Sequence, residues 1–190
     1  VRYQGQAKVS LVLQPRSENI DLSGFVAQNF IDDELKRHWQ RLGVEPAGLC
    51  SDEVFIRRAF LDSIGTLPAV EKITAFMKSR AKDKRVQLVD ELLGLTGDSS
   101  RDVYNNEYSA YWALKWGDLL RNNRNKVGDG GMWAFYNWMR ASFRESKPFD
   151  QFVREIITAQ GSIYANGPAN YFKIATTPQD LAEATAQVFL

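Results

Sequence analysis

The stretch formed by residues 108–155 constrains the fold more than any other part of this sequence. It holds four of the five tryptophans of the chain, on two segments of helix-like composition joined by a loop rich in asparagine and glycine. Large aromatic side chains bury the most area per residue, so two such helices packed together would form the centre of a hydrophobic core. The sequence therefore predicts a helical fold built around this stretch.

The composition is typical of a soluble globular domain, with 190 residues of which 44% are hydrophobic and 25% are charged. A net charge of +1 gives no overall field that would favour nucleic acid. No apolar run approaches the roughly 18 residues that a membrane-spanning helix needs. We therefore expect no nucleic-acid partner and no membrane span. No signal-peptide pattern follows Val1, so we expect the chain to be cut from a longer protein whose targeting signal lies upstream.

The metal-binding and redox residues are few. Cys50 and His38 are the only cysteine and the only histidine. This chain alone therefore cannot form an internal disulfide, a tetrahedral zinc site or a Cys-x-x-Cys-His haem attachment. We predict no metal site and no cofactor held by these residues themselves.

The N-terminal segment differs in pattern from the rest. Residues 6–13 alternate along the chain in the way that is typical of a β-strand. A lone strand has no partner, so we expect residues 1–22 to be the end of a preceding β domain with its linker. Residues 23–190 are then a helical domain. We expect this domain to be truncated at its C-terminus, because its last helix reaches Leu190 without a stop signal.

Apolar periodicity, capping residues and helix breakers predict a series of short helices. They are expected at about 25–42, 51–63, 68–78, 86–93, 102–121, 131–144, 149–158 and 177–190. Ser23 and Thr177 are the expected N-caps of the first and last helix, and Gly43 is the expected stop of the first. The predicted fold is all-α, an irregular bundle of about seven or eight short helices with one N-terminal β-strand.

Three finer expectations concern the helix faces and the loops. The inner stripe of the second helix is expected at Val54, Phe55, Ala59 and Leu61. Residues 161–176 have no clear period and are expected to be loop. Residues 122–131 offer oxygen ligands and glycines but lack the spacing of a calcium loop, so they are predicted to be a plain connector, with a mobile lid as the alternative.

Two acid–arginine pairs are the candidate polar cluster. Asp118 and Arg121 lie three residues apart, and Asp150 and Arg154 lie four apart, which are pairing distances on a helix. In one interpretation they line a cleft where a carboxylate acts as acid or base and an arginine holds an anion. In the other they form a partly buried ion-pair network that fixes how the helices cross. Structural ion pairs are the more common kind, so we favour the second interpretation and a chain that is not an enzyme.

The aromatic side chains of the central stretch are the candidate ligand-stacking residues, namely Trp112, Trp116, Trp133 and Trp138, together with Tyr136. They can be read as a sugar-stacking platform. At helical spacing, however, an aromatic stripe is more often core. Trp133 and Trp138 are five residues apart and point in different directions, so one of the two can be exposed.

Residues 111–121 and 147–155 carry a family resemblance, and shorter matches stand at 30–32, 55–58, 61–62, 65–68, 88–93, 180–183 and 187–190. In combination, over residues 25–190, they resemble the helical domain of unknown function found in planctomycete-type cytochrome c-associated secreted proteins. Residues 2–6 and the strand after them resemble the end of a bacterial immunoglobulin-like domain.

The resemblance implies a periplasmic or extracellular multidomain protein in which a Cys-x-x-Cys-His haem attachment and a second domain follow the final helix. Haem c is thus implied for the full-length protein, and the implied partners are neighbouring domains of the same polypeptide. A glycan or redox partner is left open. Our leading hypothesis is a non-catalytic helical module adjoining that haem segment.

The alternative is a hydrolase or glycan-binding domain in which Asp118, Arg121, Asp150 and the tryptophans line a groove. Burial of Trp112, Trp116 and Asp118 would favour the helical module. A concave pocket into which these side chains point would favour the alternative.

Overall fold

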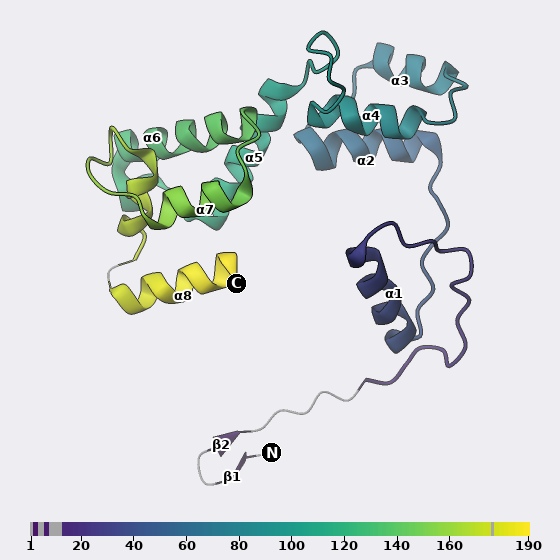
Figure 1. Ribbon diagram of the computed structural model, residues 1–190, viewed down its shortest axis with the longest axis horizontal. Coiled ribbons are helices and arrows are strands. Elements are labelled where there is room, and N and C mark those ends of the chain that lie inside the picture. The colour runs from purple at the N-terminus through teal and green to yellow at the C-terminus, as the bar shows by residue number, and fades with distance from the viewer. Residues whose placement is uncertain (1, 4–5, 8–12, 176) are drawn as a thin grey trace. The chain divides into compact units, whose positions relative to one another are not determined.

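The computed structural model describes residues 2–3, 6–7, 13–175 and 177–190 (Figure 1). The chain divides into two compact units, Val1–Cys50 and Ser51–Leu190. The described residues form eight α-helices and one 3-10 helix, with a single pair of two-residue strands at the N-terminus. The predicted all-α class is therefore confirmed for the helical part. None of the helices in the described ranges is long and apolar enough to cross a membrane.

The N-terminal strands form a minimal ladder. β1 (Arg2–Tyr3) and β2 (Gln6–Ala7) pair antiparallel. The strand predicted over residues 6–13 falls mostly on residues 8–12, which lie outside the described residues. It therefore stays a prediction, as does the immunoglobulin-like domain to which it was assigned.

The only helix described in the first unit, α1 (Phe30–Leu42), begins later than predicted. Its N-cap is Asn29 rather than Ser23, because the Asn29 side chain accepts hydrogen bonds from two backbone N–H groups of the first turn. The helix ends where predicted. Gly43 takes the left-handed conformation with φ of 62°, which a glycine adopts without steric cost.

In the second unit, α2 (Asp52–Ile64), α3 (Val70–Lys78) and α4 (Lys84–Leu93) form what we call the first helix group. Its buried core consists of Ile56, Phe60, Ile64, Phe76, Leu88 and Leu92. The stripe predicted for α2 is wrong, because the buried side chains of α2 are those spaced four apart from Ile56 to Ile64. Phe55 and Ala59 pack only at the edge of this core. The α2 sequence is apolar on two faces, and periodicity did not decide between them.

The remaining helices form the second helix group. It consists of α5 (Asn105–Leu119), α6 (Arg124–Arg144), α7 (Phe149–Ile157), the 3-10 helix η1 (Gly167–Lys173) and α8 (Pro178–Phe189). Their buried core consists of Ala113, Leu120, Phe135, Met139, Phe152, Ile156, Tyr171, Ile174 and Ala184. α5 and α6 lie side by side along much of their length (Figure 1). Thr177 caps α8 as predicted, with its hydroxyl oxygen accepting the Asp180 N–H at 3.1 Å.

Most of the segment 122–131 is helical, so the prediction of a plain connector is wrong. α6 begins at Arg124 with Asn123 as its cap, whose side-chain oxygen accepts the backbone N–H of Lys126 at 3.2 Å. Gly128, with φ of 73° and ψ of 168°, kinks the helix. This backbone conformation is open essentially only to glycine. The glycine that indicated a loop therefore marks a kink inside a helix.

The segment 161–176 was predicted to be loop, but it contains the 3-10 helix η1. η1 packs against α6 through the fully buried Asn170, whose amide N–H groups are donated to the carbonyl oxygens of Ile163 and Gly167 at 2.7 and 2.9 Å. A Cβ atom at Gly131 of α6 would lie 2.3 Å from Asn170 Oδ1. The close approach of η1 to α6 therefore requires glycine at this position.

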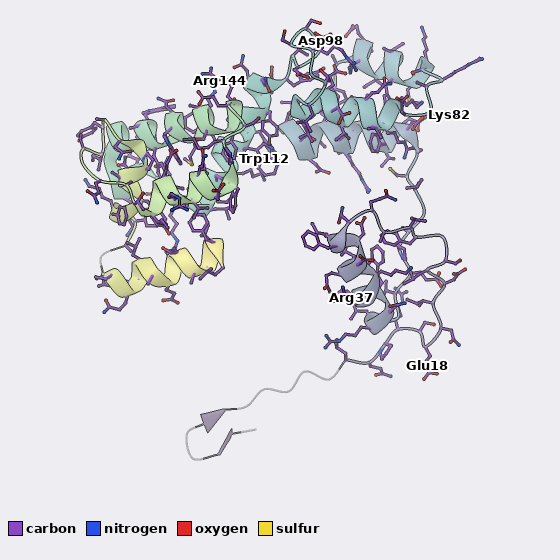
Figure 2. All side chains as sticks on the ribbon, viewed as in Figure 1. Glu18, Arg37, Lys82, Asp98, Trp112 and Arg144 are labelled. Atoms are coloured by element: carbon purple, nitrogen blue, oxygen red, sulfur yellow. The ribbon has the colours of Figure 1, made fainter. Side chains whose placement is uncertain are left out.

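The N-terminal half of α5 joins the two helix groups. Trp112, labelled in Figure 2, donates its indole N–H to the carbonyl oxygen of Ser63 near the end of α2 at 3.0 Å. Gly65, which ends α2 with φ of 71°, lies against Tyr111, and a Cβ atom there would be 2.3 Å from Tyr111 Cδ2. The glycine thus serves both the end of α2 and the contact with α5.

Candidate functional site

A pocket of about 340 Å³ lies between α5 and α6. α5 and the turn after it contribute Leu114, Gly117, Asp118 and Asn122, and α6 contributes Trp133 and Tyr136. Residues three and four apart share a helix face, which explains how the pocket-lining side chains of each helix point the same way. Gly117 has no side chain, so it leaves room between the two helices.

The turn that closes α5 sets the end of the pocket. Arg121 takes the left-handed conformation with φ of 52°, which lets the Asn122 N–H bond back to the Gly117 carbonyl oxygen at 2.8 Å. The Asn122 side chain then donates from Nδ2 to the Met132 carbonyl oxygen at 3.1 Å. Its Oδ1 is buried and has no hydrogen-bond partner. Asn122, a residue of the pocket lining, therefore carries one buried acceptor that is left unsatisfied.

Asp118 lies at this pocket, exposed and without an ion pair to any described residue. The pairing predicted with Arg121 is not formed, because Arg121 stands beyond the end of the helix. The Arg121 guanidinium instead contacts the Gln187 side-chain oxygen on α8 at 3.5 Å. It lines a different hollow, which it shares with residues of α8. Asp118 and Arg121 thus face different parts of the surface.

Asp150 and Arg154 are both exposed on α7, and no ion pair joins them within the described part of the chain. Asp150 lies in the first turn of the helix and Arg154 in the last. An acid at the N-terminus and a base at the C-terminus each complement the helix dipole. The partly buried ion-pair network predicted for the four charged residues is therefore not what the structure contains.

Three of the four candidate tryptophans take part in packing. Trp112 is half-buried and bonded to Ser63. Trp116 contacts four phenylalanine rings, those of Phe143, Phe149, Phe152 and Phe189. Trp138 stacks on Phe152 with ring centroids 4.9 Å apart, and its indole N–H is donated to Glu155 at 3.1 Å. These rings form no common platform for a ligand.

Trp133 is the exception. The residue is 55% exposed, and its ring meets Tyr136 edge to face at a centroid distance of 5.7 Å and an interplanar angle of 88°. Of the predicted site residues, the structure thus brings Asp118, Trp133 and Tyr136 together. Leu114 and Asn122 were missed. The four-residue spacing of Leu114 and Asp118 was a usable signal, whereas Asn122 lay in a segment predicted to be a connector.

Across the described residues, no group of three or more histidine, cysteine, aspartate and glutamate side chains is placed to hold a metal ion.

Comparison with protein families matches residues 30–189 to the family described as PSCyt2, protein of unknown function (DUF1549). No curated protein and no solved structure matches the chain. The family match spans the segments that carried the resemblance in the sequence, and it begins after the N-terminal strands. On this match over most of its length, the chain belongs to the PSCyt2 (DUF1549) family of proteins of unknown function.

Proposed function

We propose that this chain is a non-catalytic helical module of a secreted or periplasmic multidomain protein, and that it adjoins a c-type haem segment. In this proposal residues 1–22 are the end of a preceding β domain. The module would support neighbouring domains of the same polypeptide and hold the segment after α8 in a fixed place.

The proposal is carried by one observation, the convergence of three resembling segments on Trp116. Trp116 itself belongs to residues 111–121. Its ring contacts Phe152, from residues 147–155, at 5.3 Å, and stacks on Phe189, from residues 187–190, at 6.1 Å and 19°. The aromatic residues of the three resembling segments therefore pack against one another. This packing supports a structural role for them. They also fix the end of α8 against the body of the second helix group.

The haem itself would not be held by this chain. Cys50 and His38 are its only cysteine and histidine, and they do not form a haem-attachment motif. In the family resemblance the attachment motif follows the final helix. The contribution of the present residues is therefore to position that segment, and no chemical step is assigned to them.

The hydrolase or glycan-binding alternative required Asp118, Arg121, Asp150 and the tryptophans to line one groove. Arg121 instead contacts Gln187 of α8, and Asp150 lies in the first turn of α7. Only Trp133 of the tryptophans joins Asp118 at a pocket. Of the three residues whose burial was expected for the module, Trp112 and Trp116 are packed and Asp118 is exposed at a pocket. The separation of Arg121 and Asp150 from that pocket favours the module over this alternative.

The test uses the full-length natural polypeptide, purified after expression with c-type cytochrome maturation. A haem stain on a denaturing gel should show covalently bound haem. The Phe189→Ala variant should then be cleaved faster by a protease just after α8, because the ring that holds the helix end on Trp116 is gone. Gln179→Ala, an exposed change at the other end of α8, should leave the cleavage rate unchanged.

Full-length polypeptide without covalent haem would overturn the proposed haem neighbourhood. Equal cleavage rates for Phe189→Ala and Gln179→Ala, with haem present, would overturn the positioning role of α8.

A further inference from the structure

The pocket between α5 and α6 presents an aromatic corner. Trp133 and Tyr136 lie one helical turn apart on α6 and meet at 88°, and both line the pocket. Trp133 is more than half exposed, at 55%. Indole and phenol faces carry negative electrostatic potential, and they attract cations placed over them.

A carboxylate stands at the same pocket. Asp118 is the only charged residue in its lining, and no described cation pairs with it. The nearest basic residues in sequence are engaged elsewhere, since the Lys115 ammonium lies over the Tyr111 ring and Arg121 contacts Gln187. A single negative charge beside aromatic faces is complementary to one positive charge.

The rest of the lining is mostly apolar. Leu114 and Met132 offer hydrocarbon and thioether surface, and Asn122 is the one uncharged amide in the lining. At about 340 Å³ the pocket is at the small end of the range for ligand sites. We propose that it binds a small organic cation, an alkylated ammonium compound. The charge would lie between Asp118 and the two rings, with the alkyl groups on Leu114.

Other ligand classes match the lining less well. A calcium or magnesium ion needs about six oxygen ligands, and the side chains of this pocket supply carboxylate or amide oxygen only from Asp118 and Asn122. A neutral sugar needs several polar partners around its ring of hydroxyl groups, whereas most of this lining is hydrocarbon and aromatic. The proposal does not depend on the proposed haem neighbourhood.

The test is titration calorimetry of the chain with choline, with tetramethylammonium, and with 3,3-dimethylbutanol, the uncharged isostere of choline. We expect both cations to bind and the isostere to bind at least about 10-fold more weakly, because it lacks the charge that Asp118 and the rings recognise. Asp118→Asn should weaken choline binding about 3- to 10-fold, and Trp133→Leu should do so to a similar extent. Both side chains are exposed, so the fold should be kept, as circular dichroism would verify.

The matched control is Asp150→Asn, which removes an exposed carboxylate from α7 and should leave choline affinity unchanged. Equal affinity for choline and its neutral isostere would overturn the proposal, and so would an unchanged affinity in Asp118→Asn. Glucose is titrated in the same way, and tighter binding of glucose than of either cation would show a sugar site instead and would also overturn it.

Discussion

The first and second helix groups are held together by different means. In the first, ion pairs link the helices around a core of four aliphatic and two phenylalanine side chains. Lys72 of α3 pairs with Glu91 of α4 at 2.5 Å, and Asp52 of α2 pairs with Lys84 and Arg85 of α4 at 2.5 and 2.8 Å. All of these side chains are between 18% and 31% exposed. Each carboxylate therefore ties two helices together in a partly desolvated place.

In the second helix group, contacts between aromatic rings link the helices. Phe152 is 3% exposed and contacts Trp116 and Trp138 at 5.3 and 4.9 Å. Aromatic rings bury large areas and prefer defined mutual angles, so a cluster of them can fix helix positions without buried charge. The two groups thus differ in what links their helices: partly buried ion pairs around the first core, and a ring cluster centred on Trp116 and Phe152 in the second.

The largest effect that separates the groups is expected from Phe152→Ala. Removing a fully buried ring from the centre of the second helix group should cost about 3–5 kcal/mol of unfolding free energy. Denaturant unfolding would give this value. Hydrogen exchange should show lost protection in α7 and α8 before α2 and α4, because the first helix group has its own core.

Phe149→Ala is the control for this change, since Phe149 lies on the same helix and its ring contacts Trp116 as well, but the residue is 59% exposed. It should cost about 1 kcal/mol or less. Equal loss of protection in α2 and α7 of Phe152→Ala would mean that the two cores unfold as one cooperative unit. The two helix groups could then not be treated as separately stabilised.

The next effect concerns the joint between the groups. Gly65→Ala should cost about 2–4 kcal/mol, because it adds the strain of a left-handed φ to a collision with the Tyr111 ring. Gly97→Ala is matched in φ, at 73°, but has nothing within 4 Å of the new Cβ, and should cost only about 1 kcal/mol. Thermal unfolding of both variants measures the difference. Similar losses would show that the joint has no packing role.

These glycines also show what could be predicted from the sequence. The helix end predicted at Gly43 is confirmed, because a left-handed backbone strongly favours glycine and Gly43 takes it, as do Gly65 and Gly94 at the ends of α2 and α4. The same logic failed at Gly128, which has a positive φ inside α6. A glycine reports a backbone conformation, but the residues around it decide whether the helix continues.

The candidate site was harder to predict, because side-chain direction depends on where a helix ends. The pairing of Asp118 with Arg121 assumed a helix that reaches residue 121, and α5 ends at Leu119. The five-residue spacing of Trp133 and Trp138 predicted that they point in different directions. It did not predict which of the two is exposed. That is decided by Phe152 of α7, which covers Trp138 and lies far from both residues in sequence.

A smaller effect tests the ion pairs of the first helix group. Glu91→Gln keeps the shape but removes the charge that Lys72 contacts, and should cost roughly 1–2 kcal/mol at low ionic strength. The loss should shrink in added salt, as partly exposed charges are screened. Denaturant unfolding at two salt concentrations measures both quantities.

The control comes from the second helix group. Asp129 pairs with Arg124 on α6, with side chains 64% and 72% exposed, so Asp129→Asn should change stability by no more than about 0.5 kcal/mol. If Asp129→Asn costs as much as Glu91→Gln, exposure does not distinguish the ion pairs of the two groups and the comparison fails on this point.

The smallest effect is expected at Asp52, and it depends on pH. Hydrogen bonds from Lys84 and then Arg85 lower the pKa of the Asp52 carboxyl below its ordinary value of 3.8. A carboxyl whose pKa is lowered by folding contributes stability that is fully present above its unfolded pKa and is lost as the pH falls through the folded one. The unfolding free energy of the native chain should therefore exceed that of Asp52→Asn at neutral pH, and the gap should close below about pH 3.8.

The effect is small because the carboxylate is a quarter exposed, at 26%, and water screens it. Denaturant unfolding of both chains between neutral and strongly acidic pH measures the gap. A gap that stays constant across that range would mean that Asp52 acts through shape rather than charge, and that the first helix group does not owe its packing to this ion pair.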